Sequence, residues 1–161
     1  MDFKKLVEQA KIKTKEISEK AVKFSSEKLA ESGLTIKKSE DIQKIIDNSK
    51  NKKFTNKETG VSKMFTKNAI IIYADEKSDF FKEVLYILPV LATKGFSNNI
   101  PVKIASSNIK DFDYKGHSLT DFPSLVLYEN TEIKKSISGK ENILKLVKNM
   151  NLDINKQIEE L

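Results

Sequence analysis

Cysteine, tryptophan and arginine are absent from this chain of 161 residues, and histidine occurs once. Without cysteine the chain can form no disulfide, thiolate nucleophile or cysteine-ligated metal site, although this absence does not fix its redox compartment. All 29 basic side chains are lysine, which lacks the planar fork with which arginine binds phosphate or carboxylate. We therefore expect any binding of anions to be diffuse rather than finely aimed.

Long apolar runs are missing as well. No stretch approaches the roughly 20 apolar residues that span a bilayer, and the first ten residues hold no apolar run typical of a secretory signal. Apolar residues make up 39% of the chain and charged residues 32%, which is an ordinary globular profile. We expect a cytoplasmic protein with one core. The five glycines form no phosphate-binding motif, and no cofactor or metal is implied.

Positive charge is concentrated in the first part of the chain. Residues 1–67 carry 17 lysines against 10 acidic residues, and most of the excess lies in a lysine-rich segment at about 50–67. Its lysines are Lys50, Lys52, Lys53, Lys57, Lys63 and Lys67. We expect a polar loop, part of which tucks back on the domain through its apolar residues Phe54, Val61, Met64 and Phe65. The segment is either a solvated loop or a contact surface for an anionic membrane or nucleic acid, attracted by nonspecific electrostatics.

Residues 1–32 form the first predicted unit, a long amphipathic helix that ends before Gly33. Apolar residues recur in it with alternating steps of four and three, which is a heptad-like stripe. The main members of the stripe are Phe3, Val7, Ile17 and Phe24. Such a stripe packs on its own domain, on a membrane surface, or on a partner protein or second copy, and we favour the last of these.

The second predicted unit, 33–161, alternates strands and helices. Strands are expected at 34–36, 69–73, 100–105, 124–128 and 133–137, and helices from Ser39 to about 48, at 80–93 and at 141–150. Gly95 is expected to end the second of these helices. Strands separated by helices pair in parallel through crossovers, whereas the last two are joined by a turn and pair antiparallel. The pattern predicts an α/β fold in which helices flank a mixed sheet.

Short motifs in this unit resemble the thioredoxin-like family. The segment from Asp121 to Tyr128 looks like the family's segment in which a cis-proline, here Pro123, precedes Ser or Thr and an apolar strand. Tyr73-Ala74-Asp75 resembles the step that ends the family's central strand. The resemblance covers about Leu34 to Met150. It implies a thioredoxin-like sheet and a cis bond between Phe122 and Pro123.

The residues that carry the family's chemistry are missing. Glu76-Lys77-Ser78-Asp79 stand where the resemblance places the Cys-x-x-Cys motif. The family's buried acid would align with Ile71, and the tryptophan beside the motif is absent. Thiol exchange requires a thiolate nucleophile. The resemblance therefore implies a redox-inactive member, and we expect no enzyme activity.

The backbone before the cis-proline is the best binding candidate that the resemblance implies. In thioredoxin-like proteins it pairs with an extended substrate segment by strand addition, and this mode of recognition does not need the cysteines. Tyr73, Lys77, Phe122 and Pro123 would line such a groove in this chain. The alternative is that Pro123 only shapes a turn.

Other polar residues offer little chemistry. His117 has no cysteine beside it, so we expect a solvent-exposed loop residue rather than a general base or metal ligand. Asp111 and Asp113 are too few ligands for a calcium loop. Ser78 has no histidine close to it in the sequence, which disfavours a serine nucleophile.

Two hypotheses about function follow from these patterns. The first is a non-catalytic protein-interaction or peptide-binding module that contacts a partner, or a second copy, through its N-terminal helix. The alternative is a peripheral protein that associates with an anionic membrane or a nucleic acid through its lysine-rich N-terminal portion.

Overall fold

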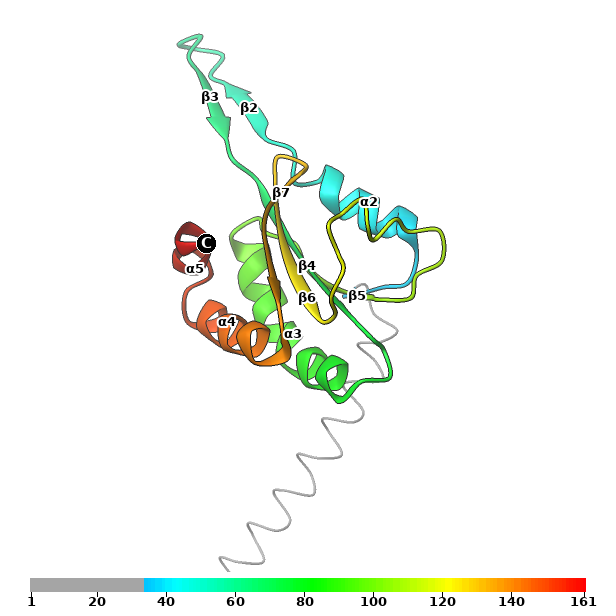
Figure 1. Cartoon of the computed structure of the whole chain (residues 1–161). Helices are drawn as coiled ribbons and strands as arrows, with labels where there is room; N and C mark the ends of the chain where they lie inside the picture. Colours follow the sequence, from blue (N-terminus) through cyan, green and yellow to red (C-terminus); the bar gives the residue numbers. More distant parts are fainter. Residues whose placement is uncertain (1–33) are drawn as a thin grey trace, which may run out of the picture.

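The computed structural model describes residues 34–161 (Figure 1). The helix predicted at 1–32 lies outside the described residues. Within them, a five-stranded sheet lies between two layers of helices, with α2 on one face and α3 and α4 on the other (Figure 1). This is the mixed sheet flanked by helices that the sequence predicted.

The five-stranded sheet has the order β1-β5-β4-β6-β7. Its strands are β1 (Thr35–Ile36), β4 (Asn68–Ala74), β5 (Val102–Ser106), β6 (Ser124–Glu129) and β7 (Glu132–Ser138). β4 pairs in parallel with β5, and β5 pairs in parallel with β1. β6 is antiparallel to both β4 and β7. The predicted parallel pairing and the predicted antiparallel edge are therefore both confirmed.

The central strand β4 divides the core in two. Its continuous apolar run is typical of a strand buried on both faces, and successive side chains point to opposite faces. Ile70 and Ile72 belong to the core under α3 and α4. Ile71 and Tyr73 belong to the core under α2. Ile71 is fully buried, so no titratable group occupies the position of the family's buried acid.

The helices in the described part of the chain are α2 (Ser39–Asp47), α3 (Asp79–Ser97), α4 (Lys140–Leu152) and α5 (Ile154–Glu160). α2 buries two isoleucines one turn apart, Ile42 and Ile46, which is the spacing of a helix with one buried face. None of these helices is both long and apolar enough to cross a membrane.

Gly95 lies inside α3, which continues to Ser97, so the prediction that this glycine ends the helix was wrong. The reason is close packing rather than capping. A Cβ at residue 95 would fall on the carbonyl oxygen of Ile100 and 2.8 Å from Cγ2 of Val102. The end of α3 can lie this close to β5 only because residue 95 has no side chain.

The lysine-rich segment forms a β-hairpin, where the sequence predicted a loop. β2 (Lys52–Thr55) pairs antiparallel with β3 (Ser62–Phe65) in a sheet of its own. The turn between them is closed by the side chain of Asn56, whose Oδ1 accepts hydrogen bonds from the main-chain N–H groups of Glu58 and Thr59. A glycine, Gly60, adopts the positive φ of +70° that this turn requires.

The hairpin projects away from the five-stranded sheet (Figure 1). The prediction that its apolar residues tuck back on the domain was wrong, because Phe54, Val61, Met64 and Phe65 are all exposed. The hairpin is nevertheless fixed at its base. Asn51 donates its main-chain N–H to Oδ1 of Asn130 at 3.0 Å and accepts, on its own Oδ1, the N–H of Lys67 at 3.0 Å.

Candidate functional site

The candidate peptide-binding site begins where β4 ends. After Ala74, the Asp75 side chain accepts the main-chain N–H of Lys77 at 3.0 Å, which shapes the turn into α3. Ser78 caps α3, since its Oγ accepts the N–H of Phe81 at 3.2 Å. The same hydroxyl donates to the carbonyl oxygen of Asp75 at 2.6 Å. Ser78 therefore has a complete structural role, and its hydroxyl proton is held by a main-chain carbonyl rather than by a base.

Tyr73 was predicted to line the groove, but its side chain is fully buried. Its hydroxyl lies 2.7 Å from that of Tyr128, and the two form a buried hydrogen bond. Burial and the neighbouring Tyr128 raise the pKa of Tyr73 well above its ordinary value. Burial also raises the pKa of Tyr128 to about 12. Tyr73 therefore packs beneath the aromatic residues of the site, and its buried side chain cannot contact a ligand.

An aromatic cluster fills the space between this tyrosine pair and the surface. The ring of Phe112 stacks on Tyr73 with centroids 5.9 Å apart, and it meets Tyr114 edge to face at 4.7 Å. Tyr114 in turn meets Phe122 edge to face at 5.4 Å. Such geometries are the favoured ones for aromatic pairs. A continuous chain of rings therefore connects the core to the partly exposed Phe122.

Tyr114 also holds the long segment between β5 and β6 in place. Its hydroxyl accepts the main-chain N–H of Ile109 and donates to the carbonyl oxygen of Ser106, both at 2.7 Å. Burial raises the pKa of Tyr114; the hydrogen bond from the main-chain N–H of Ile109 opposes this effect, and the negative charge of Glu76 adds to it.

His117 is half-buried, so the prediction of a solvent-exposed histidine was wrong. Its ring stacks on Phe112 with centroids 4.7 Å apart and approaches Tyr128 edge-on at 6.4 Å. Burial lowers the pKa of His117, while the charge of Asp113 partly opposes this effect. The histidine acts as a member of the aromatic cluster. Among residues 34–161, no group of three or more acidic or histidine side chains is placed to hold a metal ion.

Phe122 and Pro123 form the exposed edge of the site. The peptide bond between them is cis, as predicted. Phe122 keeps 39% of its surface exposed, while Pro123 is half-buried. The carbonyl oxygen of Pro123 accepts the N–H of Gly139, and Oγ of Ser124 donates to the carbonyl oxygen of Asp121. The residues on either side of Phe122 are therefore fixed, and Lys77 lies exposed on the neighbouring turn.

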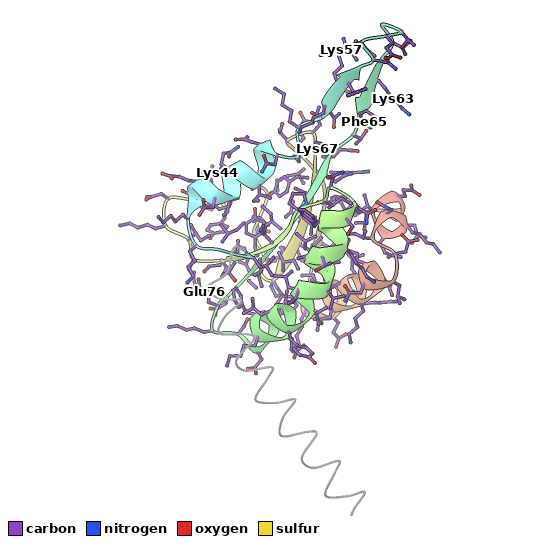
Figure 2. The ribbon with its side chains drawn as sticks, turned by 180° about the vertical axis from the view of Figure 1, so that it is seen from behind. Lys44, Lys57, Lys63, Phe65, Lys67 and Glu76 are labelled. Carbon is purple, nitrogen blue, oxygen red and sulfur yellow. The ribbon has the colours of Figure 1, made fainter. Side chains whose placement is uncertain are left out.

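The lysines predicted to meet an anionic surface gather at the other end of the molecule. Figure 2 places Lys57 near the tip of the hairpin, Lys63 along it and Lys67 at its base, whereas Glu76 lies at the opposite end. Lys50, Lys52 and Lys53 are exposed as well. Burial lowers the pKa of Lys67, and the neighbouring positive charge of Lys52 lowers it further. The two candidate surfaces are thus separate.

Sequence reasoning missed the aromatic support of Phe122. The contributing residues, Phe112, Tyr114 and His117, lie in a segment without helix or strand. A signal was present, since three aromatic rings within six residues of a polar loop are unusual. Nothing in their local spacing indicated that they reach Tyr73 on the central strand.

Comparison with known proteins gives results at the level of structure only. No family model and no curated protein matches the chain. Deadhead, a germline-specific thioredoxin from Drosophila melanogaster, is similar over 71% of this chain and 96% of its own, with 13% identity and a TM-score of 0.50. The Fasciola hepatica thioredoxin matches over 71% of this chain and 96% of its own, with 9% identity and a TM-score of 0.49. The oxidised Plasmodium falciparum thioredoxin matches over 74% and 99%, with 13% identity and a TM-score of 0.48.

Likeness at such low identity concerns the fold and not the activity. The strand order and the cis bond at Pro123 agree with the resemblance read from the sequence. The chain has a thioredoxin-like fold, and it has this fold without a cysteine.

Proposed function

We propose that this chain is a non-catalytic thioredoxin-fold protein that binds an extended peptide segment at the edge formed by Phe122 and Pro123. The lack of any cysteine removes thiol–disulfide exchange by its own thiolate. Recognition of a main chain does not depend on a thiolate, because strand addition uses N–H and C=O groups. A binding role is therefore compatible with the loss of the redox residues.

The single observation that carries this proposal is that Phe122, within residues 34–161, has unpaired main-chain groups beside a partly exposed ring. Among the described residues, its main-chain N–H and C=O take part in no hydrogen bond, although the strand that follows is fully paired. Unpaired main-chain N–H and C=O groups are the groups with which an added strand forms hydrogen bonds. The ring of Phe122 is partly exposed and is held edge-on by Tyr114, so it offers a pre-positioned apolar contact beside these groups.

The charges around the edge suggest what the peptide carries. Glu76 and Lys77 are both exposed on the turn after β4 and carry opposite signs. Phe122 favours an apolar side chain in the peptide, since aromatic anchors dominate the energy of small interfaces. We expect an extended segment with one large apolar residue and at least one charged neighbour.

A selection from a library of short random peptides tests the proposal on the full chain. Selected peptides should bind the Phe122→Ser variant at least about tenfold more weakly than the wild type, which corresponds to about 1.4 kcal/mol. Phe96→Ser is the matched control, because Phe96 is 85% exposed on α3 and lies away from the edge. This control should bind as the wild type does. If every selected peptide binds Phe122→Ser and the wild type equally, the edge is not the binding site.

Association with an anionic surface is the second candidate function. The observation that favours it is the projecting hairpin. Residues 50–67, which include the hairpin, carry six lysines and only one acidic residue, a glutamate. Exposed cations near an anionic leaflet are attracted by about 1 kcal/mol each, and salt screens this attraction. Replacing these lysines with glutamine should abolish binding to anionic vesicles at low salt, and unchanged binding would contradict the candidate.

The helix predicted at 1–32 lies outside the described residues, and contact with a partner or a second copy through it stays a proposal. The support is the apolar stripe of Phe3, Val7, Ile17 and Phe24, which a helix of this length must bury in order to be stable. Light scattering of the full chain against an Ile17→Ser, Phe24→Ser double variant tests this role. A fall in oligomeric mass supports it, whereas a monomeric wild type that the change merely destabilises contradicts it.

A further inference from the structure

The two faces of the hairpin differ in chemistry. Directly opposite residues in an antiparallel pair share a face, and the register pairs Lys52 with Phe65 and Phe54 with Lys63. Residues two apart on one strand also share a face. Two phenylalanines and two lysines therefore project together, and we name this side the Phe/Lys face. The ammonium of Lys63 lies 5.7 Å from the ring centroid of Phe65.

Exposure of both rings is unusual for a part of the chain that is held in place. Phe54 is 63% exposed and Phe65 is 48% exposed. An isolated two-stranded hairpin is at best marginally stable in water, yet this one is tied to the turn between β6 and β7 through Asn51 and Asn130. Exposed apolar groups in a fixed setting are typical of a binding surface.

A groove of about 520 Å³ continues the Phe/Lys face at the base of the hairpin. The residues from the hairpin and its base that line this groove include two aromatic residues and three lysines, Phe54, Phe65, Lys52, Lys53 and Lys67. Four asparagines line it as well, Asn68, Asn98, Asn99 and Asn155. Asn155 donates to Oδ1 of Asn98 at 2.7 Å, which orients both amides. The groove thus combines cations, aromatic faces and hydrogen-bonding amides.

Two further observations indicate that the groove suits an anionic ligand with donor groups. Lys52 and Lys67 repel each other, which lowers the pKa of Lys67 in addition to the effect of burial, and a bound anion would relieve this repulsion. Oδ1 of Asn68 is buried and, within residues 34–161, accepts no hydrogen bond. A donor at this position would satisfy it.

We propose that the Phe/Lys face and the groove at its base bind a single-stranded nucleic acid. Phe54 and Phe65 stack on unpaired bases, Lys52, Lys63 and Lys67 contact phosphates, and the asparagine amides contact base edges. Aromatic stacking platforms beside a cationic groove are how proteins bind single strands with little sequence preference, and amides are suited to the exposed edges of unstacked bases. The proposal rests on the second candidate function, because it specifies which anion the hairpin binds.

A single strand fits these residues better than a bilayer or a duplex does. A bilayer surface cannot reach the amides inside a groove, and the polar turn at Asn56 to Gly60 would have to leave water if the hairpin inserted. The bases of a duplex are stacked on one another and cannot stack on Phe54 or Phe65. A duplex would use the lysines and leave the rings without a role, whereas a bilayer would leave the amides of the groove without one.

Fluorescence anisotropy of the full chain with labelled oligouridylate and oligothymidylate of about 15 nucleotides tests the proposal. A duplex of equal length, vesicles containing phosphatidylserine, and polyglutamate serve as the other anions. We expect the single strands to bind more tightly than the duplex, the vesicles and polyglutamate. The Phe54→Ser, Phe65→Ser variant, which keeps every lysine, should weaken single-strand binding at least about tenfold, the order expected from losing a stacked base.

Matched variants separate stacking from charge and from misfolding. Phe54→Tyr, Phe65→Tyr keeps the rings and should bind single strands as the wild type does. Lys52→Gln, Lys67→Gln should lower the slope of log affinity against log salt by about 1.4, since each phosphate contact on a single strand contributes about 0.7. Lys37→Gln, Lys38→Gln removes the same charge from an exposed segment outside the groove. This control should leave the slope of log affinity against log salt unchanged.

Different failures have different meanings. If the two-serine variant binds single strands as tightly as the wild type, or if duplex or vesicles bind as tightly as single strands, the single-strand proposal is overturned. In that case a loss of binding in Lys52→Gln, Lys67→Gln still supports an anionic-surface function. If none of the anions binds at low salt, both the proposal and the second candidate function are overturned.

Discussion

Replacing Tyr73 or Tyr128 with phenylalanine probes the polar contact on which the aromatic cluster rests. The two hydroxyls bond only 2.7 Å apart, and the side chains that carry them are 0% and 1% exposed. Each single replacement deletes one hydroxyl and leaves the other buried without its partner. Such an orphaned group costs about 1–3 kcal/mol of stability. We expect each single variant to lose this amount.

The double variant Tyr73→Phe, Tyr128→Phe removes both hydroxyls and leaves no orphan. Replacing both partners of a buried hydrogen bond with apolar groups of the same shape is nearly neutral. The double variant should therefore be at least as stable as either single variant and lie within about 1 kcal/mol of the wild type. Urea unfolding followed by far-ultraviolet circular dichroism measures these differences, provided that the dependence on urea is unchanged among the four proteins.

The outcome that refutes this reasoning is additivity. If the double variant is destabilised by the sum of the two single losses, the hydroxyls act independently. The cluster beneath Phe122 would then be held by ring packing alone.

Three further outcomes are expected. Gly95→Ala should destabilise the fold by about 1–3 kcal/mol through overpacking against Ile100, although alanine favours a helix by about 1 kcal/mol; a more stable variant in thermal unfolding would contradict the close approach of α3 to β5. The free energy of unfolding should fall as the pH rises above about 10, because the folded pKa values of Tyr73 and Tyr128 are raised and the unfolded tyrosines lose their protons first. Urea titrations at about pH 8 and about pH 11 measure this fall, which should be smaller in the double phenylalanine variant. The full chain should leave insulin unreduced in the presence of dithiothreitol beyond the blank rate, since it has no thiolate; activity that a point change in this chain abolishes would overturn that expectation.

Patterns that depend on one element were readable from the sequence. The unbroken apolar run of β4 indicated a strand buried on both faces, and the isoleucines of α2 indicated a helix with one buried face. The signals of β4 and α2 come from periodicity within one element. The cis bond before Pro123 was predicted in another way, because only the resemblance of its segment to the thioredoxin-like family implied it.

The hairpin could not be read in this way. A strand with one buried face alternates apolar and polar residues, but β2 and β3 are exposed on both faces and carry lysine among their apolar residues. The segment therefore resembled a polar loop. Its order comes from the Asn56 turn and from the anchoring of Asn51 by Asn130, which is 79 residues away. Contacts of this range leave no periodic trace in the sequence.

Only part of the candidate site could be predicted from the sequence. Phe122 is partly exposed and Pro123 half-buried, but Tyr73 faces the core. The burial of Tyr73 follows from its place in the apolar run of β4, which predicts that every side chain of the strand is covered. The rings that support Phe122 come from a segment without regular structure, so only the three-dimensional structure brings them together.

Amide hydrogen exchange of the full chain, with and without a selected peptide, tests the peptide-binding proposal most directly. Strand addition would engage the free main-chain N–H of Phe122 in a hydrogen bond, so the account predicts that exchange at Phe122 slows when the peptide binds. Exchange in the hairpin at 52–65 should not change, because the hairpin lies at the opposite end of the molecule from Glu76 on the turn after β4 (Figure 2). A peptide that binds with full affinity and leaves exchange at Phe122 unchanged would contradict the proposed mode of recognition.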